Sequence, residues 1–228
     1  YEIVQGDWSS DVCSSDLWTT LKLTFFSAIG ALIWGVALAG MRVSPVPVMR
    51  WFAVGYVNIV RNTPLTLLVL FASLGLYTNL GIALAGKGPD FVDNNNFRLA
   101  VLAFIVYTAA FVCETLRAGF NTVPIGQAEA ARSLGLGFTQ VFGMIVLPQA
   151  MRAVIAPMGS VLIALTKNTT VASIIGVSEA ALLMKTQIEN HANVILGIFA
   201  IIAVCFMIIT LSEGFAFGWL AKRFAVKR

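Results

Sequence analysis

The segment Gly126-Gln127-Ala128-Glu129-Ala130-Ala131-Arg132-Ser133-Leu134-Gly135-Leu136-Gly137 separates two long apolar stretches of this chain. Its first part is rich in strong helix formers, whereas the Gly-Leu-Gly triplet at its end is typical of a helix break. Asn121 and Thr122 before Pro124 are a helix-start signal, so we expect a helix over 125–134. Gly135 can adopt the positive φ that ends such a helix.

A second helix is expected directly after this break. Apolar residues recur there at the i, i+3, i+4, i+7 spacing of one helix face, namely Phe138, Val141, Phe142 and Ile145. Pro148 should end or kink that helix, because proline lacks the backbone N–H and clashes with the preceding turn. The sequence therefore predicts two short helices joined by a tight turn, a shape that could transmit force but also fits an ordinary interfacial hairpin.

The composition places the chain in a membrane. Of its 228 residues, 58% are hydrophobic and only 11% are charged, against about 25% charged in soluble domains. Long apolar runs favour helices of about 20 residues over barrel strands, in which apolar residues would alternate. The net charge of +4 comes from cations that flank apolar runs, which indicates membrane topology rather than nucleic-acid binding.

The first 17 residues differ in character from the rest. Residues 1–17 read YEIVQGDWSSDVCSSDL, are polar, and change abruptly at Trp18. Residues 7–17 resemble the translation of a sequencing-adapter oligonucleotide, so we interpret 1–17 as non-native and leave it out of the fold prediction. The alternative is a genuine short extracellular N-terminus. A single transmembrane domain is expected over 18–228.

Five helical spans can be drawn, which predicts an all-α, polytopic membrane protein with the helix-turn-helix between the third and fourth spans. They are Leu23–Met41, Thr63–Gly86, Leu99–Cys113, Ala153–Ser178 and Val194–Ser212.

The distribution of lysine and arginine predicts the orientation. Loops 42–62 and 114–152 and the tail after 213 carry ten cations, namely Arg42, Arg50, Arg61, Arg117, Arg132, Arg152, Lys222, Arg223, Lys227 and Arg228. Loops 87–98 and 179–193 carry three, namely Lys87, Arg98 and Lys185. We therefore expect the N-terminus outside, the C-terminus in the cytoplasm and the 126–137 segment on the cytoplasmic side of a bacterial plasma membrane.

The polar segment resembles a known signature. Glu129-Ala130-Ala131, Gly135 four residues later, and Leu147-Pro148-Gln149-Ala150 are similar in type and spacing to the EAA loop of type I ABC-importer permeases, the membrane subunits of binding-protein-dependent uptake systems. The resemblance implies that this loop docks on a separate ATPase. The coupling residues that it implies are Gly126, Gln127, Glu129, Ala130, Ala131, Leu134 and Gly135.

Three further motifs resemble the polar amino acid uptake branch of that family. They are Arg61-Asn62-Thr63-Pro64-Leu65, where Asn62 replaces the usual Gly, Glu114-Thr115-Leu116-Arg117-Ala118-Gly119, and Lys167-Asn168-Thr169. The likeness covers 18–228 and is greatest to the glutamate permeases of corynebacteria and other actinobacteria. It implies an amino acid substrate, with glutamate favoured.

Lys167 is the most unusual residue within a span, because an ammonium at the bilayer centre costs about 2.5–3.5 kcal/mol on insertion scales. One interpretation is that Lys167, Asn168, Thr169 and Thr170 line the substrate path. The other is structural, with Lys167 paired to Glu179, Glu114 or a partner subunit. The neighbouring pair Glu114 and Arg117, at i,i+3 spacing, could simply satisfy each other.

The resemblance also defines the expected partners. They are a cytoplasmic ABC ATPase dimer, a homologous permease or a second copy of this chain, an extracytoplasmic substrate-binding protein and membrane lipid. We expect no enzyme activity, metal or cofactor in this chain, since Gly81–Gly88 ends in Gly where a phosphate loop needs a hydroxyl. The alternatives are an ion-coupled secondary amino acid carrier, for which only Glu114 offers a titratable acid within a span, and a non-transporting scaffold.

Overall fold

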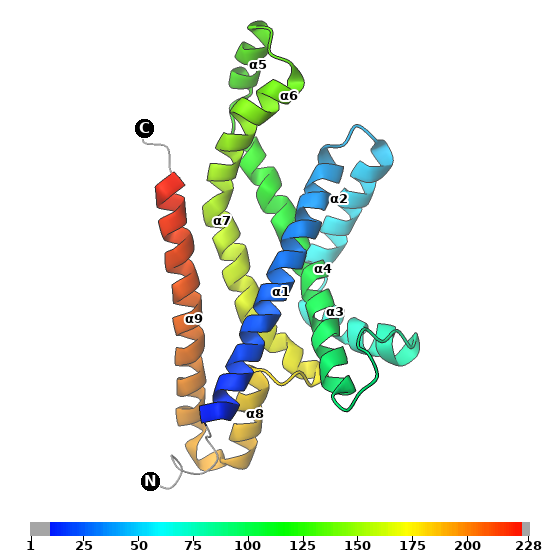
Figure 1. Cartoon of the computed structure of the whole chain (residues 1–228), viewed down its shortest axis with the longest axis vertical. Helices are drawn as coiled ribbons and strands as arrows, with labels where there is room; N and C mark the ends of the chain where they lie inside the picture. Colours follow the sequence, from blue (N-terminus) through cyan, green and yellow to red (C-terminus); the bar gives the residue numbers. More distant parts are fainter. Residues whose placement is uncertain (1–9, 225–228) are drawn as a thin grey trace.

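The computed structural model describes residues 10–224, which are helical with short connections and contain no strand (Figure 1). Residues 1–9, Lys227 and Arg228 lie outside the described residues, whereas residues 10–17 form the start of α1. The elements are α1 (Ser10–Val43), α2 (Pro47–Asn62), α3 (Leu65–Leu70), η2 (Phe71–Asn79), α4 (Phe91–Asn121), α5 (Ile125–Ser133), α6 (Phe138–Val141), η3 (Phe142–Val146), α7 (Leu147–Asn168), η4 (Thr169–Ile175), α8 (Ala180–Asn190), η5 (Ala192–Val194) and α9 (Ile195–Phe224).

The all-α membrane architecture is confirmed in the described part of the chain. Four helical runs are long and apolar enough to cross a membrane: 15–43, 91–121, 138–175 and 192–224. A fifth candidate span is a pair of helices, α2 and the α3–η2 run, that meet at an angle of 105°. The predicted number of spans is thus reached only when this bent pair is counted as one.

The predicted second span, Thr63–Gly86, is wrong in its bounds, and so is the predicted loop 42–62. Most of that loop is α2, and the following helix ends at Asn79. The bend has a local cause, because Pro64 disfavours helical backbone at the residue before it, and Thr63 is extended with φ −95° and ψ 129°. The loop prediction failed because the segment is a helix that buries Ala53, Val57 and Val60 against other helices.

Side chains satisfy two backbone carbonyls next to the bend. Thr63 donates its hydroxyl to the carbonyl of Ile59 at 2.8 Å, and Asn62 donates its amide to the carbonyl of Asn58 at 2.7 Å. A helix end leaves its last carbonyls without intrahelical partners, which is costly in hydrocarbon. The polar residues before Pro64 therefore stabilise the break itself.

The predicted fourth span, Ala153–Ser178, begins earlier and ends earlier in the structure. The helical run starts at Phe138 and continues to Ile175, where Gly176 stops it with φ +77°. Pro148, which was predicted to end or kink the helix, does not end it. A π-helical turn, η3, precedes it, and such a turn accommodates a missing i→i−4 hydrogen bond.

Other predicted boundaries also shift. The third span, Leu99–Cys113, is the middle of the longer α4, and the predicted loop 179–193 contains α8. The last span extends from the predicted Ser212 to Phe224, so that Glu213 lies within it.

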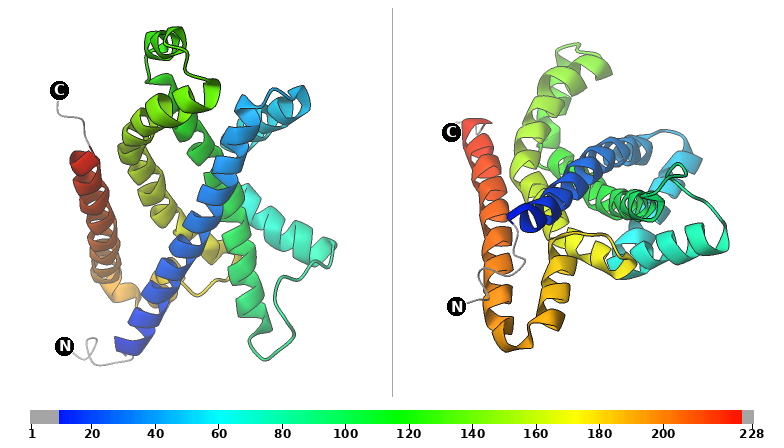
Figure 2. Two further views of the ribbon diagram at one scale, coloured as in Figure 1. Left: turned by 45° about the horizontal axis from the view of Figure 1, so that its top comes forward. Right: turned by 60° about the horizontal axis from the view of Figure 1, so that its bottom comes forward.

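The helices form an open bundle in which α1 packs along α4, α7 crosses α4, and α9 packs on α7 at the edge (Figures 1 and 2). The buried core lies mainly between α1, α2, α4 and α7. One end of the bundle carries the α1–α2 turn, α5 and α6, and the other carries α8 and the start of α4 (Figure 1). We refer to these as the α5 end and the α8 end.

Candidate functional site

The polar segment folds as the predicted helix, turn and helix at the α5 end, where it projects beyond the other helices (Figure 1). The turn is a Schellman motif. The N–H of Leu136 donates to the carbonyl of Ala131 at 3.2 Å, and the N–H of Gly135 donates to that of Arg132 at 2.9 Å. Gly135 has φ +86°, which confirms its predicted positive φ and fixes the angle at which the chain leaves α5.

This turn is anchored to the long helix that follows it. Gln149 of α7 donates its side-chain amide to the side-chain oxygen of Gln127 at 2.7 Å and to the carbonyl of Ile145 at 3.0 Å. Ala131 is buried, so one face of α5 packs inward. α5 is thus joined to α7 by this bond and packs on α6 and on η3, the turn that leads into α7.

The outer face of the segment is open and partly apolar. Of the seven predicted coupling residues, Ala131 is buried and the other six are exposed, namely Gly126, Gln127, Glu129, Ala130, Leu134 and Gly135. Leu134 is 83% exposed, and Ile125 at the start of α5 and Phe138 at the start of α6 are nearly as open. Large exposed apolar side chains of this kind suit a docking surface.

The helices beneath the segment meet at a glycine. A β-carbon placed on Gly119 of α4 would stand 2.2 Å from Cγ2 of Val154 and 3.1 Å from the carbonyl oxygen of Ala150. The two helices therefore approach as closely as their backbones allow. Gly119 belongs to the predicted Glu-x-x-Arg-x-Gly motif, and its role here is this contact.

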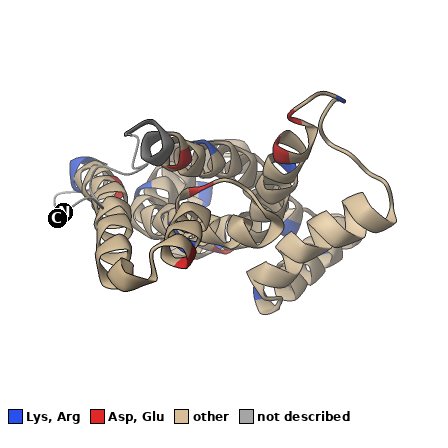
Figure 3. Ribbon diagram, turned by 90° about the horizontal axis from the view of Figure 1, so that it is seen from below, with Lys and Arg blue, Asp and Glu red and all other residues tan. Residues whose placement is uncertain are grey.

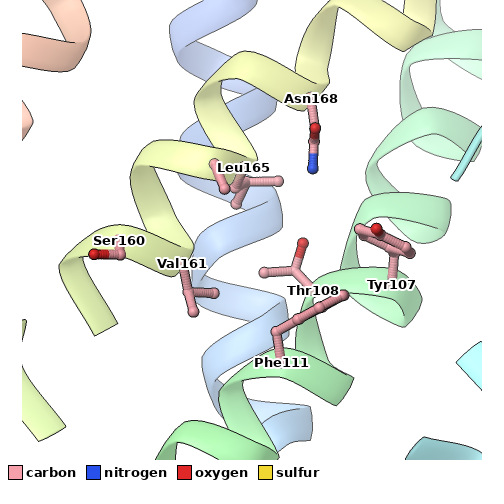
Figure 4. Close-up of a pocket in the computed structure, with 8 residues that line it drawn as sticks. Tyr107, Thr108, Phe111, Ser160, Val161, Leu165 and Asn168 are labelled. Atoms are coloured by element: carbon pink, nitrogen blue, oxygen red, sulfur yellow. The ribbon is translucent and has the colours of Figure 1, made fainter. Parts of the chain in front are cut away.

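A cavity of about 250 Å³ lies between α4 and α7, within the part of the bundle that the spans form. Figure 4 shows Asn168 and Phe111 toward opposite ends of the group of side chains that line it. The walls combine aromatic and aliphatic groups with a few polar ones, as in small-molecule sites. They are Tyr107, Thr108, Phe111, Ser160, Val161, Ala164, Leu165 and Asn168.

Of the four predicted path residues, only Asn168 lines this cavity. Thr169 is buried and donates its hydroxyl to the carbonyl of Thr166, while Thr170 donates to that of Lys167. Lys167 is exposed on the chain and forms no ion pair with any residue of 10–224. The predicted polar cluster is therefore split, with one member at the cavity and Lys167 outside it.

The structural alternatives for Lys167 within this chain are not realised among the described residues. Glu179 caps α8, where it accepts from the N–H groups of Ala181 at 2.9 Å and Leu182 at 3.1 Å. Glu114 binds arginines instead. The third alternative, in which Lys167 pairs with a residue of a partner subunit, stays a prediction.

Glu114 is the centre of a charged cluster that the sequence only partly predicted. Arg117 donates two hydrogen bonds to its carboxylate, at 2.9 and 3.0 Å, which confirms the i,i+3 pair. Arg42 of α1 forms an ion pair with the same carboxylate, and Arg61 of α2 lies 3.9 Å from it. We refer to these four residues as the Glu114 cluster; no spacing in the sequence pointed to its long-range members.

A further, partly buried carboxylate lies on a candidate spanning helix. Glu213 of α9 accepts a hydrogen bond at 2.7 Å from the hydroxyl of Thr166 on α7, and its other oxygen is buried without a partner among the described residues. It lies one residue beyond the predicted end of the last span, on a helix that continues to Phe224.

Metal-ligating clusters are absent from residues 10–224, in which no three histidine, cysteine, aspartate or glutamate side chains gather. Seen from the α8 end, charged residues are sparse on the helices (Figure 3). An apolar bundle with a cavity between two spans and a rigid projecting helix pair is the architecture of a membrane transport subunit.

Comparisons with known proteins identify the family. Residues 31–226 match the model of the binding-protein-dependent transport system inner membrane component. The glutamate transport system permease protein GluC of Corynebacterium glutamicum is 62% identical over 92% of this chain and 93% of that protein. The glutamate/aspartate import permease protein GltK of Escherichia coli is 31% identical over 96% of this chain and 98% of that protein.

Solved structures agree in fold. A chain described as the "crystal structure of an amino acid ABC transporter with histidines" matches with a TM-score of 0.84 and 26% identity over 94% of each chain. An inward-facing methionine transporter, MetNI, matches with a TM-score of 0.74 and 16% identity over 97% of this chain and all of that one.

The chain thus belongs to the family of binding-protein-dependent transport system inner membrane components. It is a multi-pass permease subunit of the ABC importer type, and not an enzyme, since the ATPase of such systems is a separate subunit. Importers of this class work with an ATPase and a substrate-binding protein.

Proposed function

We propose that this chain is the permease subunit of an ATP-driven amino acid importer, with glutamate as the favoured substrate. The observation that carries the proposal is the exposed, projecting α5–α6 segment, which is joined to α7 through Gln127 and Gln149. The permeases for glutamate in two Corynebacterium species, each at least 61% identical over 92% of this chain, support the substrate class.

In this proposal the α5 end faces the cytoplasm, with the C-terminus, and the N-terminus lies outside. An ATPase dimer grips the exposed face around Glu129 and Leu134. A second permease, either a homologue or another copy of this chain, closes the path opposite the cavity. No cofactor is bound by this chain, and residues 1–17 remain proposed as non-native.

The proposed sequence of events follows from the contacts. ATP-driven closure of the ATPase dimer displaces α5, and the Gln127–Gln149 bond and the Gly119 contact carry that displacement to α4 and α7. These two helices form the walls of the cavity. Their movement opens it toward the side at which the binding protein delivers substrate, and hydrolysis resets the inward state.

The test is substrate-stimulated ATPase activity of the purified complex in lipid nanodiscs with a glutamate-loaded binding protein. Glu129→Lys and Gly135→Asp should each remove most of the stimulation while the permease still copurifies with its spans folded. The matched control is Glu189→Lys, which makes the same charge change on exposed α8 at the opposite end. Full stimulation in the Glu129→Lys, Gly135→Asp double variant would contradict the coupling role.

The two alternatives give different results in the same preparation. An ion-coupled carrier would transport glutamate without any ATPase and would respond to the proton or sodium gradient. A scaffold would show neither uptake nor a response to Glu129→Lys. Uptake that needs both ATP and the binding protein supports the proposed importer.

A further inference from the structure

We propose that Arg61 binds a carboxylate of the transported substrate at the end of the α4–α7 cavity marked by Phe111. The inference rests on the proposed function, which makes the substrate an amino acid. It assigns a binding role to a residue of the Glu114 cluster, outside the predicted path residues Lys167, Asn168, Thr169 and Thr170.

The Glu114 cluster carries more positive than negative charge. Three guanidinium groups, those of Arg42, Arg61 and Arg117, surround the single carboxylate of Glu114. The formal charge of these four side chains is therefore +2. These cations lie at the end of the candidate spans that we assign to the cytoplasmic side, where water can meet them, and the excess charge also suits an anionic ligand.

Arg61 is the member of the cluster that is available to a ligand. Arg42 and Arg117 both donate hydrogen bonds to Glu114. Arg61 lies 3.9 Å from that carboxylate, beyond hydrogen-bond distance, and donates no hydrogen bond to any described residue. Its side chain is 45% exposed, against 17% for Glu114. The guanidinium fork of Arg61 can thus donate two parallel hydrogen bonds to a carboxylate.

Phe111 connects Arg61 to the cavity. The guanidinium carbon of Arg61 is 5.6 Å from the centroid of the Phe111 ring, and the same ring lines the cavity. The ring holds the guanidinium plane by a cation–π contact without using its N–H donors. Arg61 is not itself among the residues that line the cavity, and the shared ring places its guanidinium next to this end of it.

The rest of the cavity suits the other end of an amino acid. Asn168 lies toward the opposite end from Phe111, with Thr108 between them, whereas the hydroxyl of Ser160 points away from this group (Figure 4). The volume of about 250 Å³ suits a small metabolite. Glutamate has two carboxylates. One of them binds Arg61 in this proposal, and the other polar groups of the substrate bind the polar side chains that line the cavity, such as Asn168.

The experiment measures which carboxylate contacts Arg61. The permease is purified with its ATPase in nanodiscs without the binding protein, and labelled glutamate is displaced by glutamate, glutamine or isoglutamine. Glutamine lacks the side-chain carboxylate and isoglutamine lacks the α-carboxylate. The wild-type complex should bind one amide about 10- to 100-fold more weakly than glutamate, the range expected for a lost charge-assisted hydrogen bond.

The Arg61→Gln complex should bind glutamate weaker by a similar factor and should no longer discriminate against that same amide. Arg61→Lys should keep part of the discrimination, because it keeps the charge without the fork. Arg50→Gln, an exposed arginine at the other end of α2, is the matched control and should behave as wild type.

Two outcomes would overturn the inference, and they are distinguishable. If wild type binds glutamate and Arg61→Gln preserves the ratio between glutamate and both amides, Arg61 binds no carboxylate. If wild type binds no amino acid although its binding-protein-stimulated ATPase is intact, the proposed substrate class fails as well. Should Arg61→Gln fail to assemble, the same ratios measured in Arg61→Lys decide the question.

Discussion

Gly119 of α4 lies directly against Val154 of α7, so that a β-carbon added at Gly119 would stand 2.2 Å from Cγ2 of Val154. This contact sits between the projecting α5–α6 segment and the cavity, on the two helices that form the cavity walls. The permease proposal therefore makes Gly119 both a packing residue and part of the mechanical connection.

Gly119→Ala should destabilise the permease by about 1–3 kcal/mol, because overpacking forces the helices apart. The thermal unfolding midpoint of the purified protein would fall, and ATPase stimulation would fall with it. Gly119→Ala combined with Val154→Ala should recover most of both, since the colliding methyl groups are gone and only the Ala150 oxygen, at 3.1 Å, remains close. Gly218→Ala is the control, because nothing lies within 4 Å of its added β-carbon. Equal effects at Gly119 and Gly218 would show that close packing is not the cause.

The turn after α5 gives a second prediction. Gly135 has φ +86°, a conformation that costs a residue with a β-carbon roughly 1–2 kcal/mol. Gly135→Ala should therefore loosen the Schellman turn, and the amide of Leu136 should exchange its hydrogen faster. Gly135→Asn should be milder, because asparagine tolerates the left-handed region. Identical hydrogen exchange in wild type and Gly135→Ala would contradict the strain argument.

The Thr166–Glu213 bond predicts a defined stability pattern. Thr166→Val removes the hydroxyl that donates to Glu213 and should cost about 1.5–3 kcal/mol, the range for a hydrogen bond to a charged group. Thr166→Ser keeps the donor and should stay close to wild type. Thr166→Val together with Glu213→Leu should regain stability, since no buried carboxylate is then left without a partner. A double variant as unstable as Thr166→Val alone would show that the carboxylate is not the source of the cost.

The connection before α8 predicts a dependence on pH. Burial raises the pKa of Glu179 from 4.5 to about 7, although the N–H groups of Ala181 and Leu182 oppose the shift by stabilising the charged form. The folded chain thus holds this proton more tightly than the unfolded chain does. The stability that the protonated Glu179 contributes is fully present below about pH 4.5, and it is lost as the pH rises through about 7.

The measurement is the unfolding midpoint of the protein in nanodiscs at about pH 5 and about pH 8. Wild type should be less stable at the higher pH, by up to about 3 kcal/mol. Glu179→Gln removes the titrating group and should flatten this difference. A difference that persists in Glu179→Gln would assign the effect to another group.

The sequence predicted the elements whose signals are local. The helix over 125–134, its end at Gly135 and the all-α membrane class follow from neighbouring residues and composition, and the structure agrees. The Arg117–Glu114 pair was also local, at i,i+3. Such features depend on one helix turn, which a single sequence displays.

Features that depend on tertiary contacts were missed. Local signals do not predict the α2 helix, because its buried face is stabilised by contacts with α1 and α4. Arg42 and Arg61 reach Glu114 from positions 72 and 53 residues away in the sequence. Lys167 drew attention as a charge in an apolar run, yet the cavity side of that helix turn is occupied by Asn168.

One missed signal was readable. Pro64 in Arg61-Asn62-Thr63-Pro64-Leu65 marks a helix boundary, and the residues before it have side chains that bond to free carbonyls. Reading these together would have predicted a break there instead of the start of a straight span.

That break has an electrostatic consequence. A helix that stops at Asn62 presents its carboxyl end within the candidate spans, and that end carries roughly half a negative charge from the aligned peptide dipoles. Arg61 lies in this last turn, so the backbone itself partly neutralises its guanidinium. The helix end thus shares with Glu114 the neutralisation of Arg61, and the arginine keeps its hydrogen-bond donors for something that passes through.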